Sequence, residues 1–451
     1  MTADFDLIVI GAGMAGVSAA NKCAGAGWNV GIVDPLPYGG TCALRGCDPK
    51  KILRRGAEII DAAHLMGDTG ISENGIRIDW AALMRHKRGF TDAVPEGIEQ
   101  VLAGNTVTMF HTAARFTGPN RVDIGGTEYS ADRFLIATGA RPKPLNFPGH
   151  EHLIDSTDFL NLDTLPARIV FVGGGYISFE FAHIAARAGA TCSIIEHGDR
   201  PLNGFDPDLV DDLLTSSTEE TGISVHTSTT ITRINPTSDG FTVTVAQGDR
   251  SSTIAADIVV HGAGRTPNVD GLNLAAANVA VSSRGVTVAG HLQSTTNPAV
   301  YAAGDVADTA GSPLTPVAVS EGKVAASNML KGAATIPEYT AVPSTVFTLP
   351  ELNRVGLLED EARAQGFDII IRNTDASRWY SSYRIGAHTA RAKIIIDRTT
   401  DTILGAHLLG RGYAELTNTF ALAIKLRLTT RQLKSAPTSY PSLGSDLSSM
   451  L

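Results

Sequence analysis

The sequence predicts an α/β protein in which two βαβ units precede a C-terminal α+β domain. Two short apolar runs each end in a glycine-rich loop, at Gly11–Gly16 and at Gly173–Ser178, and each loop opens into a helical pattern. From about Ala341 the chain instead alternates apolar and polar residues, which is typical of antiparallel strands. The loops predict the two βαβ units, and the alternation predicts the last domain.

Length and composition exclude several classes of protein. The 451 residues allow two to four domains, and the formal net charge of −9 argues against nucleic acid or an anionic membrane as a partner. No apolar run reaches the ~20 residues that span a bilayer. Residues 1–6 lack the basic start of a signal peptide, so we expect a cytoplasmic enzyme. Four cysteines are too few for a disulfide scaffold or a cysteine-rich zinc site, and no metal site is predicted.

The first βαβ unit carries a dinucleotide-binding pattern. Asp6–Ile10 has the length and branching of a buried parallel strand. Gly11 is expected to make the turn that follows, Gly13 to let the backbone approach a pyrophosphate, and Gly16 to let the helix pack on the strand. The next strand ends at Asp34, whose carboxylate can accept ribose hydroxyls. Together these features predict a Rossmann-like domain.

Residues 39–51 hold two cysteines in a glycine-rich approach to a helix. Cys42 and Cys47 stand at positions i and i+5, which lie about 140° apart around a regular helix. A disulfide between them therefore needs a distorted first turn, and strained disulfides are readily reduced. Taken alone the pair is ambiguous, because two unrelated buried thiols are the ordinary condition of cysteines in the cytosol.

The second βαβ unit repeats the first. The strand Arg168–Val172 runs into the loop Gly173–Ser178, where Ser178 replaces the third glycine and is small enough for close packing. The following strand, Thr191–Ile195, ends in Glu196. The repeat predicts a second dinucleotide with its own domain, and the alternative is a glycine-rich helix start without a ligand.

Glu196 bears on the choice of that dinucleotide. A carboxylate at the end of this strand favours free ribose hydroxyls and repels a 2′-phosphate. His197 and Arg200 follow closely and would partly offset the charge, unless both are simply solvated. The sequence therefore favours NADH over NADPH.

Further segments complete the domains. Phe134–Thr138 is predicted as a buried strand closed by Gly139, and Gly264–Asn268 marks the return from the second unit. Val300–Asp305 is a strand with an acid at its carboxyl end, where Asp305 would bond a polyol chain or cap a helix. Other expected elements are a helix at 314–330, strands at 342–348, 392–397 and 402–409, and helices at 359–365 and 415–426.

These features resemble the class I pyridine nucleotide-disulfide oxidoreductases, the family of glutathione reductase, dihydrolipoyl dehydrogenase and mercuric reductase. The resemblance covers nearly the whole chain, and its most specific marker is the Gly-Gly-Thr-Cys-(x4)-Cys element at 39–47. The other markers are Gly11–Gly16, Ala137–Gly139, Gly173–Glu180, Gly304–Asp305, Val342–Ser344 and Val355–Leu357.

The resemblance implies FAD on the first unit, NAD(P)H on the second, and a homodimer whose active sites are shared by two subunits. The corresponding domains are residues 1–147 with 265–338, residues 148–264, and residues 339–451. Cys47 would lie against the flavin and Cys42 would face a disulfide substrate. Glu180 would pair with Lys50 or Lys51 beside the flavin, or else form an ordinary helix salt bridge. The expected cofactor-binding residues are Gly11, Gly13, Gly16, Asp34, Gly40, Thr41, Thr138, Gly139, Gly304, Asp305, Gly173, Gly175, Tyr176, Ser178, Glu196, His197, Arg200 and Gly264.

The resemblance also implies roles for Tyr176 and for the charge around the cysteine pair. Tyr176 matches the residue that gates the nicotinamide pocket. A thiolate is the nucleophile in disulfide exchange, so the thiols of Cys42 and Cys47 need a low pKa. The helix N-terminus and the lysine pair would supply the positive potential.

The tail departs from the disulfide-reducing members. They carry a His-Pro pair and a Glu that orients the His, whereas this chain has Tyr440 and Ser445 at those positions, with Asp446 one position out of register. Tyrosine has a reference pKa of about 10 against about 6.5 for histidine, so Tyr440 can donate a hydrogen bond but is a poor proton shuttle near pH 7. Asn21 and Asn328 stand where glutathione reductases have arginines, and the tail lacks the cysteine pair of mercuric reductases.

We therefore expect an FAD-dependent NAD(P)H:disulfide oxidoreductase that passes electrons through Cys42 and Cys47 to a low-molecular-weight disulfide. Tyr440 would replace the histidine as proton donor. One alternative is an NAD(P)H oxidase or a quinone or metal-ion reductase of the mercuric type. The other is a redox-sensing protein without turnover.

Overall fold

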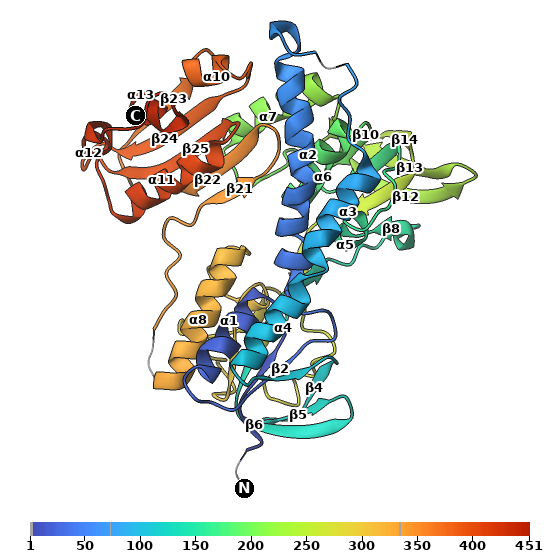
Figure 1. Cartoon of the computed structure of the whole chain (residues 1–451), viewed down its shortest axis with the longest axis vertical. Helices are drawn as coiled ribbons and strands as arrows, with labels where there is room; N and C mark the ends of the chain where they lie inside the picture. Colours follow the sequence, from blue (N-terminus) through green and yellow to red (C-terminus); the bar gives the residue numbers. More distant parts are fainter. Residues whose placement is uncertain (1–2, 73, 333–334) are drawn as a thin grey trace. The chain divides into compact units, whose positions relative to one another are not determined.

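The structure is a computed structural model that describes residues 3–72, 74–332 and 335–451. The chain divides into two compact units (Figure 1). The first comprises residues 1–51, 85–143 and 264–339, and the second comprises residues 52–84, 144–263 and 340–451. Most of the segment expected to bind FAD lies in the first unit, and the expected NAD(P)-binding and C-terminal segments lie in the second. Among the described residues, no helix is both long and apolar enough to cross a bilayer.

A doubly wound sheet forms the centre of the first unit. Strands β3, β2, β1 and β6 run parallel in that order, and β19 also pairs parallel with β6. The first half of β6 pairs instead with the antiparallel β4–β5 hairpin. The bounds are β1 Phe5–Ile10, β2 Val30–Val33, β3 Thr108–Phe110, β4 Ala114–Gly118, β5 Arg121–Ile124, β6 Thr127–Ile136 and β19 Val300–Ala302.

Small residues let two helices of this unit approach closely. Helices α1 (Met14–Ala24) and α8 (Thr315–Lys331) lie side by side (Figure 1). A Cβ at Gly322 would overlap the backbone oxygen of Ala15, so no larger residue fits at this contact. The remaining elements of the unit are α4 Val94–Gly104, β7 Ala140–Pro142, β16 Arg265–Pro267, β17 Val281–Ser282, β18 Gly285–Thr287 and β20 Ala307–Asp308. Two long helices, α2 (Cys47–Leu65) and α3 (Trp80–Thr91), contribute residues to both units.

The second unit contains a parallel sheet of the same kind. Its order is β11-β10-β9-β15-β8, and β9 and β10 have the bounds that the sequence predicts. A three-stranded antiparallel sheet, β12-β13-β14, belongs to the same unit. The bounds are α5 Ser156–Phe159, β8 Leu153–Ile154, β9 Arg168–Val172, α6 Tyr176–Arg187, β10 Thr191–Ile195, α7 Pro207–Thr221, β11 Ser224–His226, β12 Thr230–Thr237, β13 Gly240–Gln247, β14 Arg250–Ala256 and β15 Ile258–His261.

The C-terminal part of the second unit is an antiparallel sheet in the order β21-β22-β25-β24-β23. The predicted α/β fold with a C-terminal α+β domain is thus confirmed, although β22 and β23 were not expected as strands. Apolar residues of β24 and β25 pack against helix α11 in one core cluster. The bounds are β21 Ser344–Val346, β22 Glu351–Gly356, α9 Glu359–Ala364, β23 Ile369–Asp375, α10 Tyr380–Tyr383, β24 Arg391–Asp397, β25 Ile403–Gly410, α11 Tyr413–Lys425, α12 Thr430–Ser435 and α13 Leu447–Met450.

Candidate functional site

The glycine-rich loop of the first unit is tightly built. Gly11 has φ +108°, and a Cβ there would overlap the backbone oxygen of Ala137, so only glycine suits the turn. A Cβ at Gly16 would overlap the backbone oxygen of Gly11, which places the helix directly against the turn. A Cβ at Gly40 would lie 2.6 Å from the Cα of Gly13, so the approach to the cysteine segment lies against this loop.

Asp34 closes the loop from the neighbouring strand. Its carboxylate accepts the Ala12 N–H at 2.8 Å and the Leu36 N–H at 2.9 Å. A carboxylate can accept about four hydrogen bonds, so Asp34 retains capacity for two hydroxyl donors. The arrangement fits the ribose of a dinucleotide whose pyrophosphate faces the start of α1.

A second cofactor segment lies close to the first loop. Gly304 has φ +76°, and a Cβ there would lie 3.5 Å from the Cβ of Ala15. The Gly304 N–H donates to Glu321 at 2.7 Å. Burial raises the pKa of Asp305, although Arg265 acts in the opposite direction. A half-buried carboxylate of this kind fits a hydroxyl donor, as the polyol chain of FAD would supply.

Thr138 and Gly139 complete this part of the site. The Thr138 hydroxyl donates to the backbone oxygen of Asn268 at 2.6 Å, and the Asn268 N–H donates to the Gly139 oxygen at 2.9 Å. The Lys143 N–H donates to the oxygen of Gly264 at 3.1 Å. The predicted FAD residues in Gly11–Gly16, Gly40 and Gly304 thus lie together. Thr138 and Gly264 take part in hydrogen bonds that join the chain after β6 to the chain around β16.

The two cysteines lie on a distorted helical start. Residues Thr41–Arg45 form a π-helix, and α2 begins at Cys47. A π-helix has i→i+5 hydrogen bonds, which bring residues five apart closer to one face than an α-helix does. Cys42 is half-buried and Cys47 is exposed, and their side chains are hydrogen-bonded to one another. The predicted distortion is therefore present, and it brings the two sulfurs together.

The thiol pair titrates as a unit. The hydrogen bond with Cys47 raises the pKa of Cys42, burial raises it further, and a hydrogen bond from Thr315 lowers it. Two thiols in contact lose their protons in two steps, because the second proton must leave against the charge of the first thiolate. The raised pKa of Cys42 therefore keeps the proton on that sulfur, which differs from the low thiol pKa that we expected from the sequence, and only Thr315 acts in the opposite direction.

The lysines that follow Cys47 are both on the first turns of α2. Lys50 is buried and Lys51 is half-buried. Glu180 is also buried, and its carboxylate accepts the Phe347 N–H at 3.1 Å. The pairing of Glu180 with one of these lysines stays a prediction.

Glu196 is built into the glycine-rich loop of the second unit. Its two carboxylate oxygens accept the N–H groups of Gly174 at 2.5 Å and Gly198 at 2.6 Å. Gly173 has φ +93°, and a Cβ there would lie 2.5 Å from the Cα of Ala263. Glu196 is 8% exposed, so its charge sits at the loop rather than in bulk solvent. Sequence reasoning missed Gly174, whose N–H fixes the acid.

The other predicted residues of this loop differ in exposure. Ser178 is fully buried, and a Cβ at Gly262 would overlap its hydroxyl, so the predicted close packing is present. Tyr176 is 45% exposed at the start of α6. His197 is exposed with its Nδ1 3.0 Å from Glu196, whereas Arg200 lies 3.6 Å from Asp211. The sequence suggested that Arg200 would offset the charge of Glu196, but Arg200 instead lies beside the carboxylate of Asp211.

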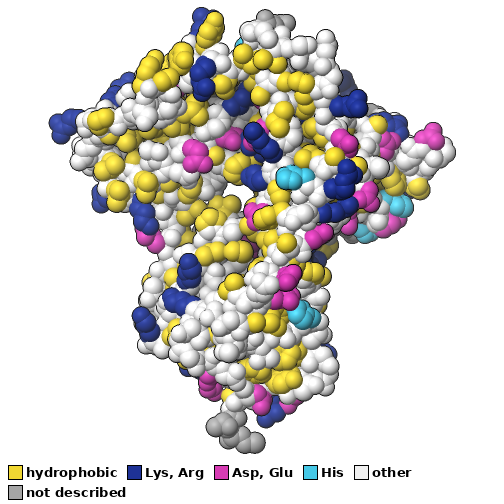
Figure 2. Space-filling model, viewed as in Figure 1, with side chains coloured by type: hydrophobic (Ala, Val, Ile, Leu, Met, Phe, Trp, Pro, Cys, Tyr) yellow, Lys and Arg dark blue, Asp and Glu magenta, His cyan; other side chains and the backbone are white. Residues whose placement is uncertain are grey.

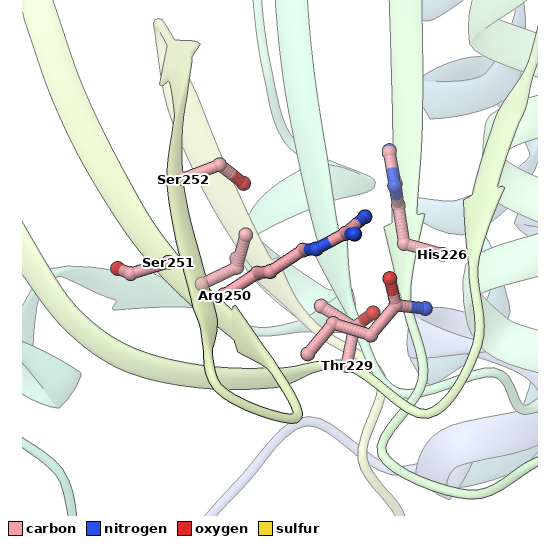
Figure 3. A pocket seen from close by; sticks show the side chains of 7 residues that line it. His226, Thr229, Arg250, Ser251 and Ser252 are labelled. Atoms are coloured by element: carbon pink, nitrogen blue, oxygen red, sulfur yellow. The ribbon is translucent and has the colours of Figure 1, made fainter.

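A pocket of about 410 Å³ is lined by residues of β11, β13 and β14 and by Thr229, and contains none of the predicted site residues. Figure 3 shows Arg250 extending toward His226, while Ser251 points away. His226 ends β11, and its oxygen accepts the N–H of Glu196 at 2.8 Å. The pocket therefore lies at the edge of the parallel sheet β11-β10-β9-β15-β8, which we call the nucleotide-binding sheet, and not at the thiol pair.

The tail places Tyr440 at the surface. Tyr440 is 80% exposed, and its ring stacks on Tyr380 with centroids 6.4 Å apart. Ser445 donates to the oxygen of Ser442 at 2.6 Å, and Asp446 accepts a hydrogen bond from Ser381. Both residues near the missing Glu are thus engaged locally, and sequence reasoning missed Tyr380 as a neighbour of Tyr440.

The two asparagines at the arginine positions are also engaged in structural hydrogen bonds. Asn21 accepts a hydrogen bond from Asn105 at 2.8 Å. Asn328 is 1% exposed and bonds the backbone of His291 and Thr335. The whole amide of Asn328 and the side-chain oxygen of Asn21 thus already serve hydrogen bonds within the fold.

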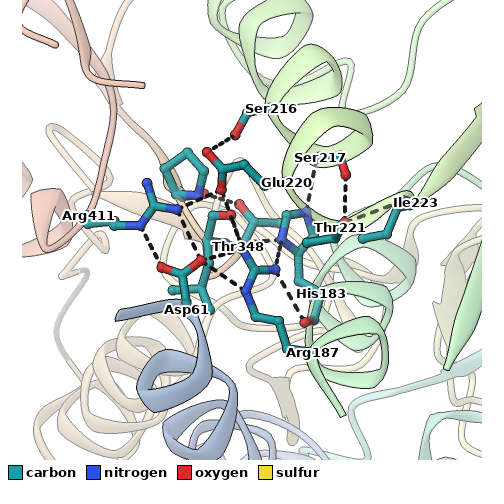
Figure 4. Close-up of polar contacts among 12 residues, drawn as sticks. Asp61, His183, Arg187, Ser216, Ser217, Glu220, Thr221, Ile223, Thr348 and Arg411 are labelled. Carbon is teal, nitrogen blue, oxygen red and sulfur yellow. Dashed lines mark hydrogen bonds and ion pairs between the residues drawn. The ribbon is translucent and has the colours of Figure 1, made fainter. Parts of the chain in front are cut away.

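A buried charge cluster was not anticipated from the sequence. Asp61 of α2 binds Arg187 of α6 at 2.6 Å and Arg411, directly after β25, at 2.6 Å (Figure 4). Arg411 also binds Glu220 of α7 at 2.7 Å, and Arg187 lies 3.1 Å from the Nδ1 of His183. The four ion-paired side chains are at most 14% exposed. The cluster therefore ties the nucleotide-binding sheet to the C-terminal sheet within the second unit.

Comparison with known proteins agrees with this geometry. A model of the pyridine nucleotide-disulphide oxidoreductase family matches residues 5–322, and a model of its dimerisation domain matches residues 342–450. The glutathione reductase of Burkholderia cepacia is 33% identical over 444 residues, covering 98% of this chain and 97% of that protein. The dihydrolipoyl dehydrogenase of Thermus scotoductus is 33% identical over 448 residues, covering 98% and 96%. The mercuric reductase of Bacillus cereus is 30% identical over 447 residues, covering 98% and 70%.

Proposed function

The chain belongs to the class I pyridine nucleotide-disulfide oxidoreductase family, and within it we propose an NADH-dependent reductase of a low-molecular-weight disulfide. Members of the family are FAD-dependent, take electrons from NAD(P)H and carry a redox-active disulfide. The C-terminal residues 342–450 are its dimerisation domain. The contact between Cys42 and Cys47 at the start of α2 is the observation that carries the proposal.

The residues of this chain divide the work between them. When bound, FAD supplies the two-electron chemistry that links the nicotinamide to the dithiol. Cys42, the more enclosed sulfur with Thr315 beside it, attacks the substrate disulfide. Cys47 then attacks Cys42 to release the second thiol and restore the disulfide. In the homodimer, Tyr440 of one subunit donates a proton to the substrate thiolate that leaves from the dithiol of the other subunit.

NADH is proposed as the electron donor because of Glu196. Its charge is held in the loop by two backbone N–H groups and is 8% exposed. A 2′-phosphate placed beside a fixed carboxylate is repelled, and at 4 Å the repulsion amounts to ~1 kcal/mol in water and ~4 kcal/mol near a protein surface. Free ribose hydroxyls can instead donate to it.

Glu196→Gln is expected to narrow the preference for NADH. The amide keeps the size of the side chain and one acceptor, but it removes the charge. The ratio of kcat/KM for NADH to that for NADPH should fall roughly tenfold or more. Asp199→Asn, at an exposed carboxylate in the segment that follows Glu196 after β10, is the control and should leave the ratio nearly unchanged. An unchanged ratio in Glu196→Gln would remove the electrostatic basis of the preference.

Tyr440→Phe is expected to slow disulfide turnover about tenfold. The leaving thiolate carries the charge, and in the variant it loses the hydrogen bond that the Tyr440 hydroxyl donates to it. Reduction of the flavin by NADH should stay at the wild-type rate. Both half-reactions are separable by stopped-flow absorbance. Tyr380→Phe removes the neighbouring hydroxyl but keeps the stacked ring, and it should not slow turnover comparably. Equal turnover in Tyr440→Phe and wild type would show that Tyr440 is not the donor.

The function itself is tested by anaerobic titration followed by a substrate panel. NADH and NADPH are titrated against the flavin spectrum of the holoenzyme, and NADH consumption is then followed with aliphatic, aromatic and peptide disulfides. Rapid flavin reduction with turnover of at least one disulfide is expected. Normal flavin reduction without turnover of any disulfide, but with quinone or oxygen as acceptor, would overturn the proposal in favour of an oxidase or quinone reductase.

A further inference from the structure

A buried carboxylate of helix α8 joins three separate segments of the first unit. Glu321 is 1% exposed, and its side chain accepts three hydrogen bonds. One oxygen accepts the Gly304 N–H at 2.7 Å, and the other accepts the hydroxyls of Thr309 at 2.9 Å and Tyr339 at 2.6 Å. A carboxylate suits this place because both of its oxygens act only as acceptors.

The inward direction of Glu321 contrasts with the other charges of α8. The helix also carries Lys323 and Lys331, and both lysines are exposed. Figure 2 shows basic side chains over the region where Figure 1 places α8. In the part of the chain that the structure describes, no basic nitrogen lies within 4.0 Å of the Glu321 carboxylate. Burying a carboxylate is costly unless it is paired or hydrogen-bonded, so the three donors keep Glu321 in the interior.

The first donor, Gly304, lies between α8 and α1, the helix that begins at the first glycine-rich loop. A Cβ at Gly304 would lie 3.4 Å from the Cβ of Ala318 and 3.5 Å from the Cβ of Ala15. An N–H group in such a place is costly to leave without an acceptor, and Glu321 supplies one. Asp305 follows directly, so this hydrogen bond fixes the backbone from which the Asp305 carboxylate projects.

The other two donors hold the chain farther along. Thr309 directly follows β20, and Tyr339 is the last residue of the first unit before the C-terminal segment 340–451. A Cβ at Gly311 would lie 2.7 Å from the ring of Tyr339 and 3.0 Å from the Oε1 of Glu321, so this loop packs tightly on both side chains. Burial raises the pKa of Tyr339, and the hydrogen bond to Glu321 raises it further, so the phenol keeps its proton and remains a donor.

We propose that Glu321 is a positioning residue for FAD, which holds Gly304 and Asp305 in the conformation that binds the cofactor. Tyr339 supports Glu321 from the junction with the C-terminal segment. Glu321 acts through the backbone of Gly304, and its own carboxylate is occupied by protein donors. The inference depends on the FAD dependence of the family and not on the disulfide proposed as substrate, so it stands or falls separately from the acceptor.

The test measures how tightly the full-length holoenzyme retains FAD. The holoenzyme is diluted over a range of concentrations, and the FAD that passes an ultrafiltration membrane is measured by its fluorescence, which gives Kd. Glu321→Ala should raise this Kd about 10- to 100-fold, because the Gly304 N–H loses its acceptor. Glu321→Gln should raise it by no more than about threefold, because the amide oxygen accepts from Gly304 while the amide nitrogen donates to the two hydroxyls.

Tyr339→Phe is a milder variant that leaves Glu321 in place. It removes the hydroxyl at 2.6 Å but keeps the ring that packs on Gly311, so the fold should be preserved. The Kd for FAD should rise about threefold, which corresponds to the loss of one hydrogen bond. If Glu321→Ala does not fold, this variant decides the proposal, and a Kd equal to that of the wild type would overturn it.

Asp61→Ala is the control for a general loss of stability, because it removes a buried carboxylate of the second unit. Its Kd for FAD should stay within about twofold of the wild type. With FAD in excess, Glu321→Ala should be reduced by NADH at nearly the wild-type rate, as expected of a residue that positions the cofactor without reacting. A Kd in Asp61→Ala as high as in Glu321→Ala would show that instability alone releases FAD, and a Kd in Glu321→Gln as high as in Glu321→Ala would show that charge and not hydrogen bonding is needed. Either result would overturn the inference.

Discussion

Cys42→Ser is expected to lower NADH-dependent disulfide reduction by at least ~10³-fold, because serine cannot replace a thiolate as nucleophile in disulfide exchange. The substitution leaves the glycine-rich loops and Asp34 untouched, so FAD should remain bound. Reduction of the flavin by NADH should also persist. The measurement is anaerobic stopped-flow absorbance of the flavin, followed by steady-state NADH consumption with the best disulfide of the panel.

Cys192→Ser is the matched control for Cys42→Ser. Burial raises the pKa of Cys192 to about 12, and the side chain is 2% exposed in the core, which makes its thiol unreactive. Disulfide turnover in this variant should remain within about twofold of the wild type. Undiminished turnover in Cys42→Ser would mean that electrons leave from the flavin directly. It would favour the oxidase or quinone reductase alternative.

Local patterns were enough to predict the cofactor-binding loops. At Gly11 and Gly173 the backbone has positive φ, and a side chain would strike the neighbouring strand, so the glycines are visible in the sequence because the turn requires them. The acids Asp34 and Glu196 follow from chain order, since each ends the strand that lies beside its loop. These features depend on residues close together in the chain.

Features that depend on distant residues could not be predicted in this way. The stacking of Tyr380 on Tyr440 and the engagement of Asp446 by Ser381 arise only when the tail returns to α10. Strand β22, Glu351–Gly356, was missed because it lies in the middle of its sheet between β21 and β25 and is buried on most of its length, which hides the alternation. The π-helix at Thr41–Arg45 was expected only as an unspecified distortion.

The buried cluster around Asp61 is the largest feature of this kind, since Asp61 and Arg411 are 350 positions apart. Burial alone would raise the pKa of Asp61, but hydrogen bonds and charges from Arg411 and Arg187 lower it to about 2. Burial, reinforced by Arg187, holds the pKa of His183 well below 6.5. His183 Nδ1 lies near two donors, Arg187 and the Leu349 N–H, so the neutral ring carries its proton on Nε2, toward Ser217.

Both groups therefore make the fold sensitive to acid. The unfolded chain binds a proton at His183 below about pH 6.5 that the folded protein does not, so stability falls as the pH drops below that value. Asp61 adds a second loss as the pH falls from 3.8, where an unperturbed aspartate titrates, toward about 2, and this loss amounts to about 2 kcal/mol. The midpoint of thermal unfolding should thus decline in two stages with acidification.

Asp61→Ala is expected to destabilise the protein by about 3–5 kcal/mol at pH 7, because it leaves Arg187 and Arg411 buried without their shared carboxylate. Chemical unfolding of the holoenzyme, followed by tryptophan fluorescence, gives the change in midpoint. The variant should also lose the part of the acid sensitivity that lies below about pH 4. Glu128→Ala removes an exposed ion pair with Arg121 and should cost at most ~1 kcal/mol. A loss in Asp61→Ala no larger than in this control would mean that the two arginines find other partners or water, and that the cluster does not hold the C-terminal sheet to the nucleotide-binding sheet.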